Sequence, residues 1–112
     1  MSLMKLVETT PGSFSLLLDA GTTPVDELIE RLGHEPNGYF WEGVAQLLVS
    51  AEDPALGSRF SYDSEGGMFC AHGTDRTALE TLATMMRTVI EDGDRVRRLI
   101  ATAEADGFEF DD

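Results

Sequence analysis

The sequence GHEPNGYFWEG at residues 33–43 is the most informative stretch of this chain. It contains the only Trp, Trp41, at the end of three consecutive aromatic residues that follow a Pro-Asn-Gly turn. Trp and Tyr combine a large apolar surface with a polar atom that needs a partner. The pattern predicts a helix from about Tyr39 to Ala51, whose aromatics either fix its entry or present an anchor to a partner. It contains no catalytic signature.

The segments before this motif predict two strands and a first helix. A short strand is expected at Leu6–Val7, and a largely buried strand at Phe14–Asp19. Thr23 is a favourable N-cap, and Pro24 suits the first helical position because its missing N–H would have no partner there. Gly33 then predicts the end of this helix.

The segments after the motif predict a hairpin and two further helices. Strands are expected at Arg59–Asp63 and Met68–His72, joined by a Gly-rich turn. The longest helix should begin at Asp75 with Thr74 as its cap, and Asp94 should cap the last helix. The resulting order is ββααββαα. It predicts an α+β fold in which an antiparallel sheet is packed on one face by helices.

The length of 112 residues corresponds to one domain, over residues 1–112. Residues 1–3 precede a second Met and are expected to be a cloning remnant, with the natural start at Met4. Apolar positions that share a helix or strand face predict the core. These positions are Leu16, Leu18, Leu28, Leu32, Trp41, Leu48, Leu82, Met86 and Leu99.

The charge balance is the unusual feature of the composition. Eight Lys and Arg residues stand against 21 Asp and Glu residues, which gives a net charge of −13 and a pI near 4.3. Such a surface repels nucleic acid and anionic membranes, so neither is expected as a partner. It is suited to attracting a basic protein, although acidity that serves solubility alone is an equal alternative.

Candidate catalytic and metal-binding residues are few. Cys70 and His72 would share one face of a strand, but adjacent strand side chains rarely supply a nucleophile, a base and an orienting group. Cys70 is therefore interpreted as a structural cysteine. The chain is predicted to have no catalytic residues, no metal site, no cofactor and no enzymatic activity. A lone Cys, with no signal peptide and no membrane-spanning run, favours the cytoplasm.

The acidic C-terminal tail interleaves Phe108 and Phe110 with carboxylates. We expect either a solvated tail or a short edge strand that turns its Phe side chains inward. An acidic and aromatic docking segment is the alternative.

Exposed carboxylates beside an aromatic anchor are the predicted partner-binding residues. Glu35 and Glu42 beside Tyr39 are the first candidates, and Asp63 and Glu65 at the hairpin tip are the second. A central aromatic residue with a polar rim is how interfaces concentrate binding energy. Trp41 is a weaker candidate because its helical stripe is expected to point inward.

Three segments resemble the immunity protein 51 family of bacterial polymorphic-toxin systems. They are LDAGTTP at residues 18–24, the motif at residues 33–43, and GMFCA at residues 67–71 with Asp75, Arg76 and Leu79. The resemblance covers nearly the whole chain from Met4. It implies a small cytoplasmic protein that binds and neutralises a cognate toxin, and it identifies no binding residues.

Three functions are therefore weighed. The favoured one is a toxin-neutralising binder whose partner could be a basic nuclease, because such toxins need a basic surface for phosphate. The second is a small hydrolase or thiol enzyme that uses Cys70 and His72. The third is a regulatory or structural module that recognises a peptide or self-associates. The sequence leaves the oligomeric state open.

Overall fold

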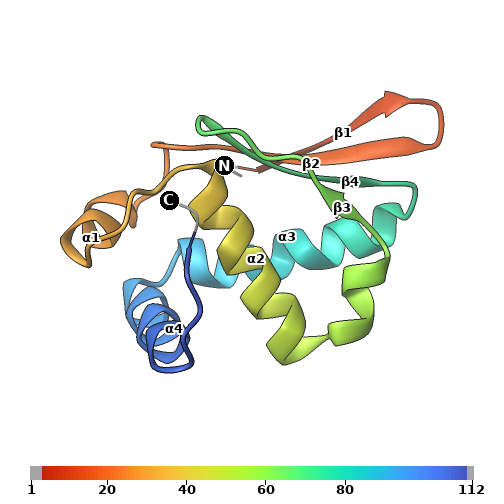
Figure 1. Ribbon diagram of the computed structural model, residues 1–112. Helices are drawn as coiled ribbons and strands as arrows, with labels where there is room; N and C mark the ends of the chain where they lie inside the picture. Colours follow the sequence, from red (N-terminus) through yellow and green to blue (C-terminus); the bar gives the residue numbers. More distant parts are fainter. Residues whose placement is uncertain (1–3, 111–112) are drawn as a thin grey trace.

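The computed structural model describes residues 4–110 and has two layers, an antiparallel sheet and a set of helices that cover one of its faces (Figure 1). The strands follow the order β1-β2-β4-β3. The predicted α+β class and the order ββααββαα are confirmed, with an added 3₁₀ helix, η1 (Pro54–Ser58), before β3. The expected cloning remnant at residues 1–3 and the acidic residues Asp111 and Asp112 lie outside the described residues.

The sheet is built from two hairpins. Strands β1 (Met4–Thr10) and β2 (Ser13–Asp19) pair around a turn at Pro11 and Gly12, where Gly12 adopts a φ of +83°. Strand β4 (Met68–Gly73) pairs with β2, and β3 (Ser61–Tyr62) pairs with β4. The first strand is thus longer than predicted. Strand β3 is shorter, because the Arg59 N–H donates to the Leu56 carbonyl of η1 instead of a neighbouring strand.

Helix α1 (Asp26–Arg31) begins later than predicted. Its N-cap is Val25, which makes no side-chain cap hydrogen bond, so the predicted Thr23 cap is wrong. Thr23 donates both its backbone N–H (3.3 Å) and its hydroxyl to the Asp26 carboxylate, which fixes a turn ahead of the helix. The predicted end is confirmed, because Gly33 has a φ of +89° directly after Leu32.

Helix α2 (Gly38–Glu52) begins inside the central motif, and each of its ends lies one residue outside the predicted bounds. Asn37 is its N-cap, and the Asn37 side chain accepts a hydrogen bond from the Phe40 N–H at 2.8 Å. The Pro-Asn-Gly turn therefore supplies the cap and the first residue of the helix.

Both later helices begin at a different cap from the one predicted. Helix α3 (Arg76–Ile90) is capped by Asp75, which accepts from the Ala78 N–H at 3.0 Å, and not by Thr74. Helix α4 (Gly93–Ala105) is capped by Asp92, which accepts from two N–H groups, and not by Asp94. A cap must reach an N–H two or three residues ahead, and only these aspartates stand at that spacing from the first turn.

The core lies between the sheet and the helices, as the apolar spacing predicts. Trp41, at 0% exposed, is fully buried, so its inward orientation is confirmed. The other predicted core residues are buried or packed against the core. Buried are Leu16, Leu18, Leu48, Leu82 and Met86; half-buried are Leu28, Leu32 and Leu99.

The C-terminal tail returns to α2 without forming a strand. The Phe110 ring stacks on Phe40, with 4.8 Å between ring centroids, and meets His34 edge-on at 5.0 Å. Gly43 makes room for it, because a Cβ there would lie 2.7 Å from the Phe110 ring. Phe108 contacts Phe110 at 5.0 Å. The inward placement of the two Phe side chains is therefore confirmed, and the edge strand is not.

Candidate functional site

The start of α2 lies directly against the turn between β3 and β4. The Gly38 N–H donates to the Gly66 carbonyl oxygen at 3.0 Å. A Cβ at position 38 would lie 1.9 Å from the Glu65 carbonyl oxygen, so this approach requires glycine. The contact brings the central motif beside a turn that the sequence places about thirty residues later.

The predicted partner-binding residues gather around this junction, and we name them the acidic face: Glu35, Tyr39, Glu42, Asp63 and Glu65. Tyr39 is 41% exposed, Glu42 is half-buried, and the remaining three carboxylate residues are exposed. Within residues 4–110, no ion pair engages Glu42, Asp63 or Glu65. Their charges are therefore not neutralised by neighbouring basic side chains.

Two titratable neighbours respond to the charge of the acidic face. Burial raises the pKa of Tyr62 to about 12, and the nearby charge of Glu42 adds to the effect. Burial also raises the pKa of the Cys70 thiol, with contributions from the charges of Asp63 and Glu65. A hydrogen bond with Ser15 opposes the shift at Cys70. Glu42 thus acts on Tyr62, which packs against the buried Phe69, whereas Asp63 and Glu65 act on Cys70 on the outer face of the sheet.

Cys70 and His72 share the outer face of β4, as the strand alternation predicts, but they are not arranged for thiol chemistry. Cys70 lies opposite Leu17 on β2 and bonds with Ser15, whereas His72 lies opposite Ser15. The raised pKa holds Cys70 in the thiol form at neutral pH, while a nucleophile needs the thiolate. Within residues 4–110 there is no group of three His, Cys, Asp or Glu that could hold a metal ion.

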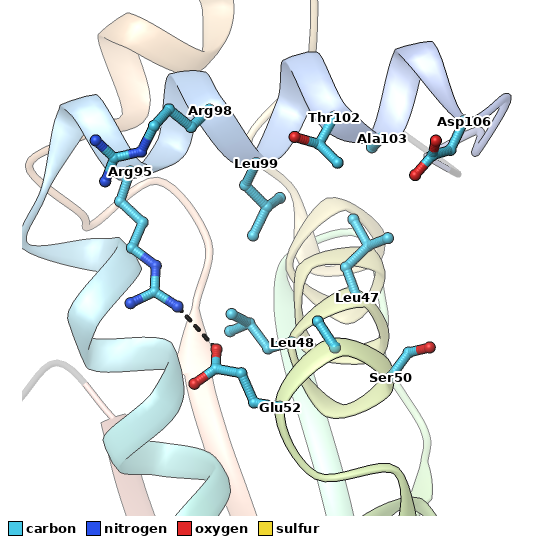
Figure 2. Close-up of a pocket in the computed structure, with 11 residues that line it drawn as sticks. Leu47, Leu48, Ser50, Glu52, Arg95, Arg98, Leu99, Thr102, Ala103 and Asp106 are labelled. Carbon is cyan, nitrogen blue, oxygen red and sulfur yellow. Dashed lines mark hydrogen bonds and ion pairs between the residues drawn. The ribbon is translucent and has the colours of Figure 1, made fainter.

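The sequence interpretation missed a groove of about 440 Å³ between α2 and α4 (Figure 2). Leu47, Leu48 and Leu99 point into it, and Arg95 of α4 reaches across to Glu52 of α2 at 2.8 Å. One feature of the sequence could have indicated this groove. Leu47 is apolar, but it lies beside the buried face of α2 and is not part of that face.

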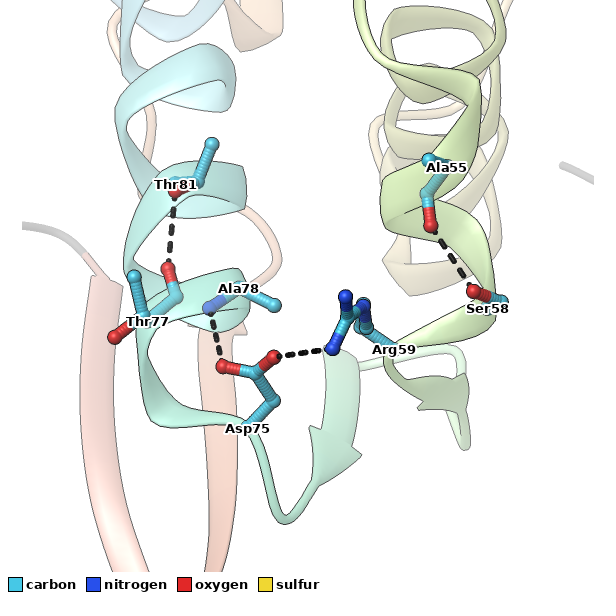
Figure 3. Close-up of polar contacts among 7 residues, drawn as sticks. All are labelled: Ala55, Ser58, Arg59, Asp75, Thr77, Ala78 and Thr81. Carbon is cyan, nitrogen blue, oxygen red and sulfur yellow. Dashed lines mark hydrogen bonds and ion pairs between the residues drawn. The ribbon is translucent and has the colours of Figure 1, made fainter.

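A second missed contact ties η1 to the start of α3 (Figure 3). The Arg59 guanidinium lies 3.4 Å from the Asp75 carboxylate, the same group that caps α3. The Ser58 hydroxyl donates to the Ala55 carbonyl at 3.0 Å within η1. These bonds hold the segment that leads into β3 against the helical layer.

The model of one protein family, Immunity protein 51, matches residues 4–105. The chain belongs to the immunity protein 51 family. The match confirms the resemblance found in the sequence, and it spans every residue of the acidic face. No curated protein and no solved structure matches the chain. No helix of this immunity protein within residues 4–110 is long and apolar enough to cross a membrane.

Proposed function

We propose that this chain binds and neutralises a cognate bacterial toxin domain through the acidic face. Membership of the immunity protein 51 family supports the neutralising role. The observation that supports the choice of surface is the junction of Gly38 and Gly66, which brings the exposed Tyr39 and the half-buried Glu42 of α2 beside the turn that carries Asp63 and Glu65. Glu42, Asp63 and Glu65 form no ion pair within residues 4–110. On this proposal the protein acts in the cytoplasm as part of a polymorphic-toxin system, by occupation of the toxin and not by catalysis.

The charge of the chain supports a basic toxin, such as a nuclease, as the partner. A nuclease needs Lys and Arg side chains to hold the phosphate backbone. A chain of net charge −13 would attract that basic surface from a distance, and its acidic face would then cover it. Tyr39 would supply the central contact, and the surrounding carboxylates would form the rim.

The test uses the full chain and a candidate toxin domain taken from the gene next to the one that encodes this chain, both purified. We expect a stable complex and loss of toxin activity at one chain per toxin domain, without any chemical change in the toxin. Turnover by the chain, seen as neutralisation at far below equal amounts and lost in Cys70→Ser or His72→Ala, would show an enzyme instead. Absence of both a complex and neutralisation would overturn the proposal.

A regulatory or structural module that recognises a peptide, or that self-associates, is the alternative function. The observation that favours peptide recognition is the groove between α2 and α4, with its apolar floor. Leu47→Lys at the margin of this groove separates the two ideas. It should leave toxin neutralisation intact if the acidic face binds the toxin, and it should abolish binding if the groove holds the partner.

A further inference from the structure

The two edges of the sheet differ in how they are protected. Strand β3 is only two residues long. Arg59, two residues before this strand, forms an ion pair with Asp75 at the start of α3 (Figure 3). Strand β1 is seven residues long and forms the opposite margin (Figure 1), where no described strand pairs with its outer side. Proteins usually shorten or cover an exposed edge, because its unpaired N–H and C=O groups pair readily with another strand. Strand β1 carries Lys5 and a bulge between Glu8 and Thr10, but it still presents the longer of the two edges within residues 4–110.

A hollow of about 300 Å³ lies beneath the margin of β1, between the sheet and α3. We name it the α3 hollow; its lining includes Leu6 and Leu16 of the sheet and Ala83, Thr84 and Arg87 of the helix. A strand added beside β1 would lie about 4.8 Å from it and turn every second side chain toward the helical layer. Helix α3 packs against β1, β2 and β4, so the α3 hollow lies between this helix and the strand beside which a fifth strand would pair.

The charges of the α3 hollow indicate what that strand should carry. Arg76 lies 4.0 Å from Glu80 and over the Phe14 ring, so its charge has a partner. Arg87 forms no ion pair with a described residue. On the added strand, an apolar side chain that points toward α3 would fill the hollow beside Ala83. A carboxylate at the next position on the same face of that strand would pair with Arg87.

A second copy of this chain fits the β1 edge poorly. Antiparallel pairing of β1 with itself about Leu6 places Glu8 opposite Met4, and pairing about Val7 places Glu8 opposite Leu6. Both arrangements set a carboxylate against an apolar, inward-facing position. Glu8 also already accepts the Gly12 N–H at 3.0 Å, and each copy carries a charge of −13.

We infer that the β1 edge receives an extended segment of the toxin domain, which adds a fifth strand to the sheet and fills the α3 hollow. The inference rests on the proposed function and adds a second contact to the acidic face. Charge on the acidic face would govern how fast the two proteins meet, and strand pairing would govern how slowly they separate.

Hydrogen exchange on the full chain, alone and bound to the toxin domain encoded beside it, tests this inference. The β1 amides that point away from β2, at every second residue, should exchange at least about tenfold more slowly in the complex, because strand addition satisfies these unpaired groups. Ala83→Leu should fill the α3 hollow, retain the fold and weaken binding about tenfold or more. Ala101→Leu, on an exposed position of α4, is the matched control and should bind normally. If Ala83→Leu fails to fold, Arg87→Glu, at an exposed position, takes its place in the binding measurement.

The outcomes separate the two proposals. A tight neutralising complex whose β1 amides exchange as in the free chain would overturn strand addition and leave the proposed function standing. Protection of β1 in the chain alone, together with a dimer in sedimentation, would assign the edge to a second copy. Failure of any complex to form would overturn both proposals.

Discussion

One turn of α2 presents two opposite surfaces. Phe40 and Trp41 are 1% and 0% exposed and hold the helix on the sheet, whereas Tyr39 is 41% exposed and Glu42 stands near Tyr62 at the surface. Consecutive residues thus divide into a pair that serves packing and a pair available for recognition. Substitutions of the inner pair should change stability and leave association unaffected, and substitutions of the outer pair should do the opposite.

The largest expected effect is on the inner side. Trp41→Ala should lower the free energy of unfolding by about 3–5 kcal/mol, because it leaves a large cavity in the core. Trp41→Phe should lower the free energy of unfolding by only about 1–2 kcal/mol. The indole N–H has no hydrogen-bond partner in the described residues, so its removal leaves no acceptor unpaired. Urea unfolding measures both. A loss of less than about 1 kcal/mol for Trp41→Ala would contradict the packing of this motif.

The junction between the two surfaces should be the next most sensitive position. Gly38→Ala places a Cβ against the Glu65 carbonyl oxygen and should cost about 1–3 kcal/mol, because the backbone must move apart. Gly67→Ala, in the same turn but with no atom near its Cβ, is the matched control and should change stability by less than about 1 kcal/mol. Equal effects of the two substitutions would mean that α2 does not rest on this turn.

Alkaline pH should expose the coupling between Glu42 and Tyr62. The unfolded chain releases the Tyr62 proton near the ordinary pKa of 10.0, and the folded chain does so only at about 12. Stability is therefore fully retained below pH 10 and lost progressively toward pH 12. Tyr62→Phe should remove this component of the pH dependence. Glu42→Gln should lower the Tyr62 pKa, as measured by tyrosinate absorbance, and an unchanged titration would place Glu42 too far away to act.

The smallest expected effect concerns Cys70. Asp63→Asn should lower the pKa of the Cys70 thiol and increase its alkylation rate a few-fold at mildly alkaline pH, because a nearby negative charge opposes thiolate formation. Asp94→Asn on α4 is the control and should leave the rate unchanged. An unchanged rate in both variants would mean that the hairpin part of the acidic face lies too far from Cys70 to affect it.

Local patterns in the sequence predicted the helices and strands, but they could not predict contacts between residues far apart in the chain. The spacing of Leu16, Leu18 and Leu82 identified strand and helix faces because burial follows the period of the backbone. Thr74 and Asp94 were wrong as caps, since several adjacent polar residues suit a cap and only geometry selects Asp75 and Asp92.

The residues of the candidate site were proposed from the sequence, but the contact between its two parts was not foreseen. The motif at residues 33–43 and the turn after β3 each offered exposed carboxylates. The approach of Gly38 to Gly66, which joins these two parts, depends on the packing of α2 over the sheet. The α3 hollow and the groove between α2 and α4 are gaps between elements, and no spacing along the chain encodes the volume between elements.

The association rate of the chain with its toxin domain, measured across salt concentrations, shows whether the acidic face binds the toxin. Glu35→Lys combined with Glu42→Lys reverses two charges of the acidic face. Glu30→Lys combined with Glu91→Lys makes the same change in net charge at exposed positions elsewhere. We predict that the first pair slows association about tenfold or more at low salt and flattens its salt dependence, while the control pair has a much smaller effect. Equal rates and equal salt slopes for the two folded variants would contradict the assignment of toxin binding to the acidic face.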